Sequence, residues 1–195
     1  NHKLDDENTF FLQQNSEAIE MGSFHNDIVS LSNENIFIAH EKAFQDRNKL
    51  TKLLKNLEAK IDNFQFIEIS DSEIPLKNII DSYLLNSQLA TNGQNEMMLI
   101  LPEEVKSYET CMAWLDKLKQ ISDIKLYDFV NIRQSMMNGG GPACLRLKVV
   151  LDENETKELN QNFLMTSEKL DAIKSLIERE YRDCLLYTSD AADDL

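Results

Sequence analysis

The sequence contains the same order of predicted elements twice: two strands, a helix and a third strand. The first set predicts strands over residues 28–32, 35–40 and 64–69 and a helix over 46–61. The second set predicts strands over residues 82–89, 97–101 and 124–129 and a helix that begins at 102. A recurrence after roughly 60 residues indicates an internal repeat. Units of the ββαβ type predict an α/β fold.

Apolar stripes with helical spacing predict the helices of the chain. The stripe of the first helix is Leu50, Leu53, Leu54, Leu57 and Ile61. The stripe of the second is Val105, Tyr108, Met112, Leu115 and Leu118. Pro102 suits the first position of this second helix, because proline has no N–H to leave unpaired there. A further helix is expected after Thr166, with an apolar face made of Leu170, Ile173, Ile177 and Tyr181.

A glycine loop follows the second set. Residues 138–144 read Asn-Gly-Gly-Gly-Pro-Ala-Cys and hold three of the five glycines of the chain. Because glycine has no Cβ, such a run lets the backbone turn tightly and lets a ligand approach the main chain. The loop does not match the glycine patterns that cradle phosphate groups. It is therefore either a ligand-binding segment or an ordinary turn.

Cys144 ends this loop and opens a predicted strand over residues 145–151. The two-residue period of a strand places Cys144 on the same face as Arg146 and Lys148. Nearby positive charge favours the thiolate, so Cys144 is a candidate nucleophile. The alternative is a small buried hydrophobic residue, which is the commonest role of an intracellular cysteine.

A second group of polar residues precedes the first strand. His25 and Asp27 follow Gly22 by three and five residues. A cysteine and a histidine, with an aspartate to hold a cationic group, form the arrangement that nucleophilic thiol chemistry needs. The alternatives are a loop histidine and a turn-forming aspartate. His40, Cys111 and the methionine pairs at 97–98 and 136–137 are interpreted as structural.

The composition limits the classes of partner. The net charge of −14 argues against nucleic acid and against an anionic membrane surface, because both require basic patches. The sequence has no apolar run of the length that spans a bilayer, and no apolar segment of the signal-peptide kind follows its first residues. Three cysteines without metal or disulfide spacing favour a reducing cytoplasm.

The last twelve residues, 184–195, differ in kind from the rest. They resemble the translated read-through of a sequencing-library adaptor over nearly their full length. We therefore expect residues 1–183 to be the native part of a catalytic domain and residues 184–195 to be foreign to it.

Three segments resemble the succinylarginine dihydrolase family: residues 24–28, residues 131–136 and, above all, residues 138–147. The resemblance runs from near Phe10 to Asp183, and Met137 departs from it where an arginine is expected. It implies membership of the guanidino-group-modifying pentein superfamily, whose fold is an α/β propeller of five ββαβ blades. The chain then holds only the last two to three blades.

The resemblance also implies roles for four residues. Cys144 corresponds to the nucleophile and His25 to the catalytic histidine, whereas Asp27 and Asn138 correspond to substrate-binding residues. No metal and no cofactor are implied. The family also uses a catalytic glutamate and further substrate ligands upstream of this chain, so we expect the chain alone to be inactive.

The implied function is that of a bacterial cytoplasmic hydrolase in arginine catabolism. Such an enzyme converts N2-succinyl-L-arginine to N2-succinyl-L-ornithine, two ammonia and carbon dioxide through a covalent thiouronium intermediate. The expected partner is this small molecule, with no nucleic acid or membrane, and the full-length protein is expected to be a homodimer. Two alternatives stay open: a deiminase or amidinotransferase of the same fold, and a non-catalytic interaction module with a structural glycine loop.

Overall fold

The computed structural model describes residues 9–138, 140–144 and 151–181. The chain divides into two compact units, residues 1–147 and residues 148–195, and each is described by itself. The predicted strand at 145–151 lies almost wholly outside the described residues, and so do Arg146 and Lys148.

The first set of predicted elements forms one three-stranded sheet. Its strands are β1 (Ser30–Asn33), β2 (Ile36–His40) and β3 (Gln65–Ile69), in the order β1-β2-β3. β1 pairs with β2 in antiparallel fashion, and β2 pairs with β3 in parallel. The predicted hairpin is therefore confirmed, although its turn is at Glu34 and Asn35, because Asn33 pairs with Ile36. Glu34 adopts a φ of 49°, in the left-handed region that tight two-residue turns require.

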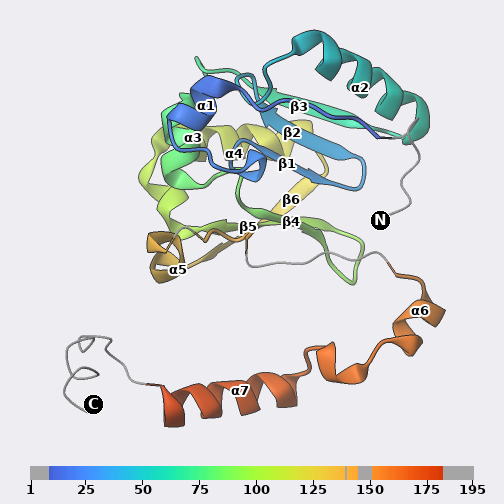
Figure 1. The fold of residues 1–195 in the computed structure, drawn as a ribbon, viewed down its shortest axis with the longest axis vertical. Helices are drawn as coiled ribbons and strands as arrows, with labels where there is room; N and C mark the ends of the chain where they lie inside the picture. The colour runs from blue at the N-terminus through green and yellow to red at the C-terminus, as the bar shows by residue number, and fades with distance from the viewer. Residues whose placement is uncertain (1–8, 139, 145–150, 182–195) are drawn as a thin grey trace, which may run out of the picture. The chain divides into compact units, whose positions relative to one another are not determined.

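Helix α2 (Arg47–Lys60) makes the parallel crossover between β2 and β3. The Asp46 side chain accepts hydrogen bonds from the N–H groups of Asn48 and Lys49, which fixes the start of the helix. Leu50 is buried, and the helix lies on the side of the first sheet that faces away from the second (Figure 1). The predicted helix over 46–61 is confirmed.

The second set repeats this arrangement. Strands β4 (Gln88–Thr91), β5 (Met97–Pro102) and β6 (Ile124–Val130) form a sheet in the order β4-β5-β6. β4 and β5 are antiparallel, and β5 and β6 are parallel. Two sheets with the same order and the same directions establish a repeated ββαβ arrangement within an α/β fold.

The predicted strand over 82–89 is wrong in its first part. Residues Leu76–Ser82 form helix α3, because Leu76, Ile79 and Ile80 recur at helical spacing and are all buried. Tyr83 ends this helix with a φ of 56°, and β4 begins only at Gln88. Leu84 and Leu85 are buried in the turn between the helix and the strand.

The predicted second helix is in fact two elements. The 3₁₀ helix η3 (Glu103–Ser107) is followed by Tyr108 in an extended conformation and then by α4 (Glu109–Ile121). The predicted stripe still faces the core: Val105, Leu115 and Leu118 are buried, and Tyr108 and Met112 pack against the core cluster. The buried face of α4 also includes two residues outside that stripe, Cys111 and Trp114. That face consists of Cys111, Trp114, Leu115 and Leu118.

Four short elements that the sequence patterns did not predict complete the described part of the first unit: α1 (Ser16–Glu20), η2 (Asn26–Ile28), α3 as above and α5 (Arg133–Met137). The expected strand start at residue 28 is wrong, because η2 occupies that position and β1 begins at Ser30. The two sheets contact each other through β1 and β4, the equivalent strands of the two repeats.

The second unit holds α6 (Glu153–Glu158), η4 (Gln161–Phe163) and α7 (Ser167–Glu180). The Thr166 side chain accepts from the N–H of Lys169 and caps α7, so the predicted final helix is confirmed. Within the part of the chain that the structure describes, no helix has the length and apolar character needed to cross a membrane.

Candidate active site

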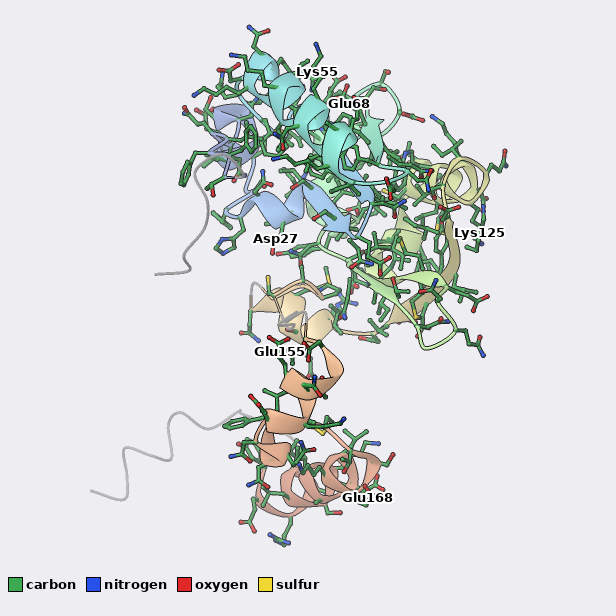
Figure 2. All side chains as sticks on the ribbon, turned by 90° about the vertical axis from the view of Figure 1, so that its right-hand side faces the viewer. Asp27, Lys55, Glu68, Lys125, Glu155 and Glu168 are labelled. Carbon is green, nitrogen blue, oxygen red and sulfur yellow. The ribbon has the colours of Figure 1, made fainter. Side chains whose placement is uncertain are left out.

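The candidate residues meet at the turns that precede the first strand of each repeat. His25 and Asp27 lie at η2, immediately before β1, and Asp27 is labelled there in Figure 2. Residues 83–87 form the corresponding turn before β4. The glycine loop, residues 138–144, approaches this second turn from the far end of the unit's sequence. The fold thus joins three segments that are about 60 residues apart from one to the next.

Asn86 is the residue that connects the three segments. It is fully buried, and its Nδ2 donates to the backbone carbonyl of Asp27 at 3.4 Å. The same amide has both Nδ2 and Oδ1 at 3.9 Å from the Cys144 Sγ. The backbone carbonyl of Asn86 accepts from the N–H of Ala143 at 2.9 Å. One buried amide therefore contacts the Asp27 turn and the candidate nucleophile together.

The close approach of the glycine loop explains why residue 141 has no side chain. A Cβ on Gly141 would overlap the Asn86 Oδ1 and would lie 2.6 Å from the Cδ1 of Tyr83. Gly141 does not adopt the left-handed φ region, so space and not backbone conformation requires glycine here. The glycine at 141 thus lets the loop backbone pack closely against the Asn86 side chain, while the predicted approach of a ligand to this loop stays a prediction.

Asp27 combines partial burial with an unsatisfied carboxylate. Its Oδ1 is shielded from solvent and has no hydrogen-bond partner among the described residues. A shielded carboxylate oxygen without a donor is costly, because it loses hydration and gains nothing in return. The neighbouring Asn26 Nδ2 is also shielded and unpartnered. The turn is therefore chemically incomplete, and a ligand that presents N–H groups would complete the carboxylate.

His25 is exposed at the start of the same turn. Its backbone carbonyl accepts from the Ser23 Oγ at 3.1 Å, and Gly22 turns the chain just before it with a φ of 107°. Among the residues that the structure describes, no hydrogen bond joins the His25 ring to Cys144 or to Asp27. The structure thus places His25 and Asp27 in one turn and connects that turn to Cys144 only through Asn86.

Cys144 is exposed at the end of the glycine loop, and its N–H donates to the carbonyl of Gly141 at 3.1 Å. Arg146 and Lys148, which were predicted to favour the thiolate of Cys144, lie outside the described residues. Asn138 is exposed at the end of α5, where its Nδ2 donates to the carbonyl of Gln134 at 2.9 Å. No described hydrogen bond joins Asn138 to the group around Asn86.

A surface cavity of about 530 Å³ adjoins the glycine loop. Tyr83 lines this cavity and also lies next to Gly141. Glu104 lines it as well, and its Oε2 is shielded from solvent and has no hydrogen-bond partner within the described chain. The other lining residues are Glu103, Ser107, Asn131, Arg133, Met136 and Met137. Asn86, Tyr83 and Glu104 were not candidates from the sequence. The signal at Asn86 was a polar stretch, Asn86-Ser87-Gln88, between the apolar residues Leu85 and Leu89.

Of the residues interpreted as structural, His40, Cys111 and Met97 are buried. His40 is buried, with its Nε2 3.1 Å from the carbonyl of Ile74 and its Nδ1 accepting from the N–H of Lys42. Burial lowers the pKa of His40 below its usual value. Cys111 is buried, and desolvation raises the pKa of its thiol. Met97 is also buried in the core, whereas Met137 is 80% exposed.

The described residues contain no cluster of three or more histidine, cysteine, aspartate or glutamate side chains that would suit a metal ion. The segments that meet at Asn86 instead carry an exposed thiol at Cys144, an exposed imidazole at His25 and a carboxylate at Asp27 with one shielded oxygen. Together these groups suit nucleophilic attack on a cationic carbon whose N–H groups the carboxylate holds.

Comparisons with known proteins show which family the chain resembles. A family model described as succinylarginine dihydrolase matches residues 1–195. The chain is 38% identical to an N-succinylarginine dihydrolase of Shewanella loihica over its whole length, and this covers 42% of the relative. Relatives of the same name in Shewanella putrefaciens and Idiomarina loihiensis are each 36% identical over 98% and 100% of the chain. The chain spans 42–43% of the length of these curated relatives.

Proposed function

The chain belongs to the succinylarginine dihydrolase family, and from this premise we propose that the complete protein hydrolyses N2-succinyl-L-arginine. The products are N2-succinyl-L-ornithine, two ammonia and carbon dioxide, with two waters consumed. The observation that carries the proposal for this chain is the meeting of the Asp27 turn and Cys144 at the Asn86 amide. This meeting supports the proposal, because a thiol hydrolase needs residues from distant segments to lie close together.

In the proposed first step the Cys144 sulfur adds to the guanidinium carbon to give a tetrahedral adduct. The carbon–nitrogen bond to one terminal nitrogen then breaks, and His25 gives its proton to the departing ammonia. The resulting thiouronium carbon is attacked by a water that His25 deprotonates, and the Cys144 sulfur leaves. A second hydrolysis, of the ureido product, releases the second ammonia and carbon dioxide together with the ornithine amine.

Asp27 is proposed to hold the guanidinium nitrogens. Its shielded, unpartnered Oδ1 supports this role, because charge-assisted N–H donors would supply the missing hydrogen bonds. Asn138 is proposed to contact the substrate from the glycine loop. Its amide now caps the end of α5, so contact with substrate requires it to exchange the Gln134 carbonyl for a substrate group.

The same premise leads us to propose a pentein propeller for the complete protein. Two ββαβ repeats that contact each other through equivalent strands, β1 and β4, support rotational repetition about an axis next to those strands. The two repeats account for two of five blades. The chain is proposed to hold the last two to three blades, whereas the remaining blades, the catalytic glutamate and the other substrate ligands would come from sequence that precedes it. We also propose that the complete protein is a cytoplasmic homodimer.

The test of the function is to count the ammonia released per succinylarginine by the complete protein. Two ammonia per substrate, with succinylornithine as the other product, is the expected result. One ammonia per substrate would identify a deiminase, and transfer of the amidino group to an added amine would identify an amidinotransferase. An inert protein with an intact fold would favour the interaction module.

We further propose that residues 184–195 are foreign to the native chain. The proposal rests on their resemblance to adaptor read-through, although the family match extends through them. Ending the chain at Asp183 should leave the melting temperature unchanged, because the segment has no amphipathic period with which to pack. Scanning calorimetry of the complete protein with and without the segment measures this. A clear fall in melting temperature would assign the segment to the native fold.

A further inference from the structure

We propose that Asn86 is a positioning residue for the nucleophile: its buried side-chain amide fixes the Cys144 sulfur against the Asp27 turn and directs an N–H at that sulfur. The inference rests on the proposed function, in which Cys144 attacks the substrate. It assigns a role to a residue that lies in neither the glycine loop nor the His25 turn.

The orientation of the amide follows from its partners. A backbone carbonyl only accepts, so the Nδ2 of Asn86, and not its Oδ1, faces the carbonyl of Asp27. Nδ2 carries two hydrogens, and one of them remains for the Cys144 Sγ at 3.9 Å. Oδ1 lies at the same distance from the sulfur. A thiol can donate to Oδ1 and a thiolate can accept from Nδ2, so the amide serves both forms of the nucleophile.

The amide is held rigidly enough to position another group. Asn86 is fully buried, and its backbone carbonyl accepts from Ala143, the residue next to the nucleophile. Gly141 packs so closely against the Oδ1 that a Cβ would overlap it. The loop that carries the sulfur is therefore fixed to Asn86 by a backbone hydrogen bond on one side and by packing on the other. Such support determines how accurately a catalytic group is placed.

The primary experiment measures how fast iodoacetamide alkylates Cys144 in the complete protein, with peptide mass spectrometry to separate this cysteine from the others. Asn86→Asp keeps the size and shape of the side chain but replaces the N–H donor with a carboxylate. We expect about tenfold slower alkylation or more, because a negative charge about 4 Å away opposes a developing thiolate. The reagent is uncharged, so the variant does not repel it.

The matched control is Asn78→Asp. Asn78 is a half-buried amide whose Nδ2 donates to the Thr110 Oγ1 at 3.2 Å, and it has no described contact with the glycine loop. The control should keep the parent alkylation rate. Turnover adds a second readout, since Asn86→Asp should lower kcat more than it raises KM if substrate binding is left to other residues. Alkylation at the parent rate by folded Asn86→Asp would overturn the inference.

A double-mutant cycle keeps the inference testable if Asn86→Asp does not fold. Gly141→Ala should destabilise the protein by overlap with the Asn86 amide and with the Tyr83 ring, and Asn86→Ala should remove the nearer of these two obstacles. The double variant should therefore lose less stability than the sum of the two single changes. Additive losses would show that the two residues do not touch and would overturn the inference.

The outcomes separate this inference from the proposed function. If Cys144→Ser abolishes turnover while folded Asn86→Asp is alkylated at the parent rate, the function stands and the role of Asn86 is wrong. If Cys144→Ser retains turnover, the proposed function is wrong, and the role of Asn86 as support for a nucleophile is wrong with it, whatever the alkylation rate.

Discussion

The turns before β1 and β4 occupy equivalent places in the two repeats but differ in what they expose. The first holds an exposed histidine, His25, and a carboxylate, Asp27, with an unpartnered oxygen. The second holds Asn86 and Ser87, both fully buried. One turn thus offers reactive groups and the other supports them. The repeat supplies the same backbone position twice, and the side chains divide the tasks of binding and support between the two positions.

The Asn86 side chain contacts both the Asp27 turn and the end of the glycine loop at Cys144. A buried amide has donors and an acceptor close together, so it can hold a carbonyl and a sulfur at once. The first turn is held by hydrogen bonds from the Ser23 and Ser30 hydroxyls, but the Oδ1 of Asp27 has no described partner and is left to interact with a ligand. Changes in the first turn should therefore affect activity more than stability, and changes in the second should do the reverse unless they reach the sulfur.

The largest expected effect comes from Cys144→Ser in the complete protein. Serine is close in size, and the position is exposed, so folding should be unchanged. A hydroxyl is far less ionised than a thiol at neutral pH, so turnover should fall below detection. Ammonia release and the melting temperature are the two measurements. A folded variant that still releases ammonia would show that Cys144 is not the nucleophile.

Asp27→Asn should have the next largest effect and should act on the substrate. The amide keeps the shape of the side chain but loses the charge, and charge-assisted hydrogen bonds contribute roughly 1.5–3 kcal/mol each. We expect kcat/KM to fall by about 10- to 150-fold, with little change in stability because Oδ1 has no partner within the described chain. Unchanged kinetics together with a lower melting temperature would return Asp27 to a turn-forming role.

His40 predicts a smaller effect, on stability, that belongs to the first repeat alone. It ends β2, whereas Pro102, which cannot titrate, ends β5. Desolvation lowers the pKa of His40, although the Ile74 carbonyl and the carboxylates of Asp71 and Glu41 oppose this and Lys42 assists it. Because the folded pKa lies below the unfolded value near 6.5, the stabilisation is fully present above pH 6.5. It is lost as the pH falls from there through the folded pKa.

Unfolding of the complete protein by urea between pH 7.5 and 5 measures this effect. The parent should lose about 1.4 kcal/mol for each unit by which its pKa is lowered, and His40→Gln should lose less over the same interval. Equal slopes in parent and variant would show that other groups govern the pH dependence. His40 at the end of β2 would then make the first repeat no more sensitive to pH than the second, in which Pro102 ends β5.

The sequence predicted the repeated strands and α2 because their periods are strong and local. It missed α3 because an apolar run such as Ile79-Ile80 fits a buried strand or a buried helix equally well, and only packing decides. It named Cys144, His25 and Asp27 from motifs that are continuous in sequence. It did not name Asn86, because a buried amide shows its role only when residues 58 and 59 positions away come to lie beside it.

The smallest expected effect concerns Ser87, whose hydroxyl is shielded and unpartnered in the described structure, as is the carboxylate oxygen of Asp27. We expect the Asp27 oxygen to bind substrate and the Ser87 hydroxyl to have no role in activity. Ser87 is fully buried directly before β4, so its hydroxyl cannot reach a substrate, and the missing hydrogen bond lowers the stability of the fold.

Ser87→Ala should therefore leave turnover unchanged. It should raise the free energy of unfolding by less than about 1 kcal/mol, because the lost hydroxyl leaves only a small gap. Urea unfolding and the ammonia assay on the same preparation give both quantities. A fall in turnover at unchanged stability would show that the second turn also contacts the reacting groups, and the division between a reactive turn and a supporting turn would no longer hold.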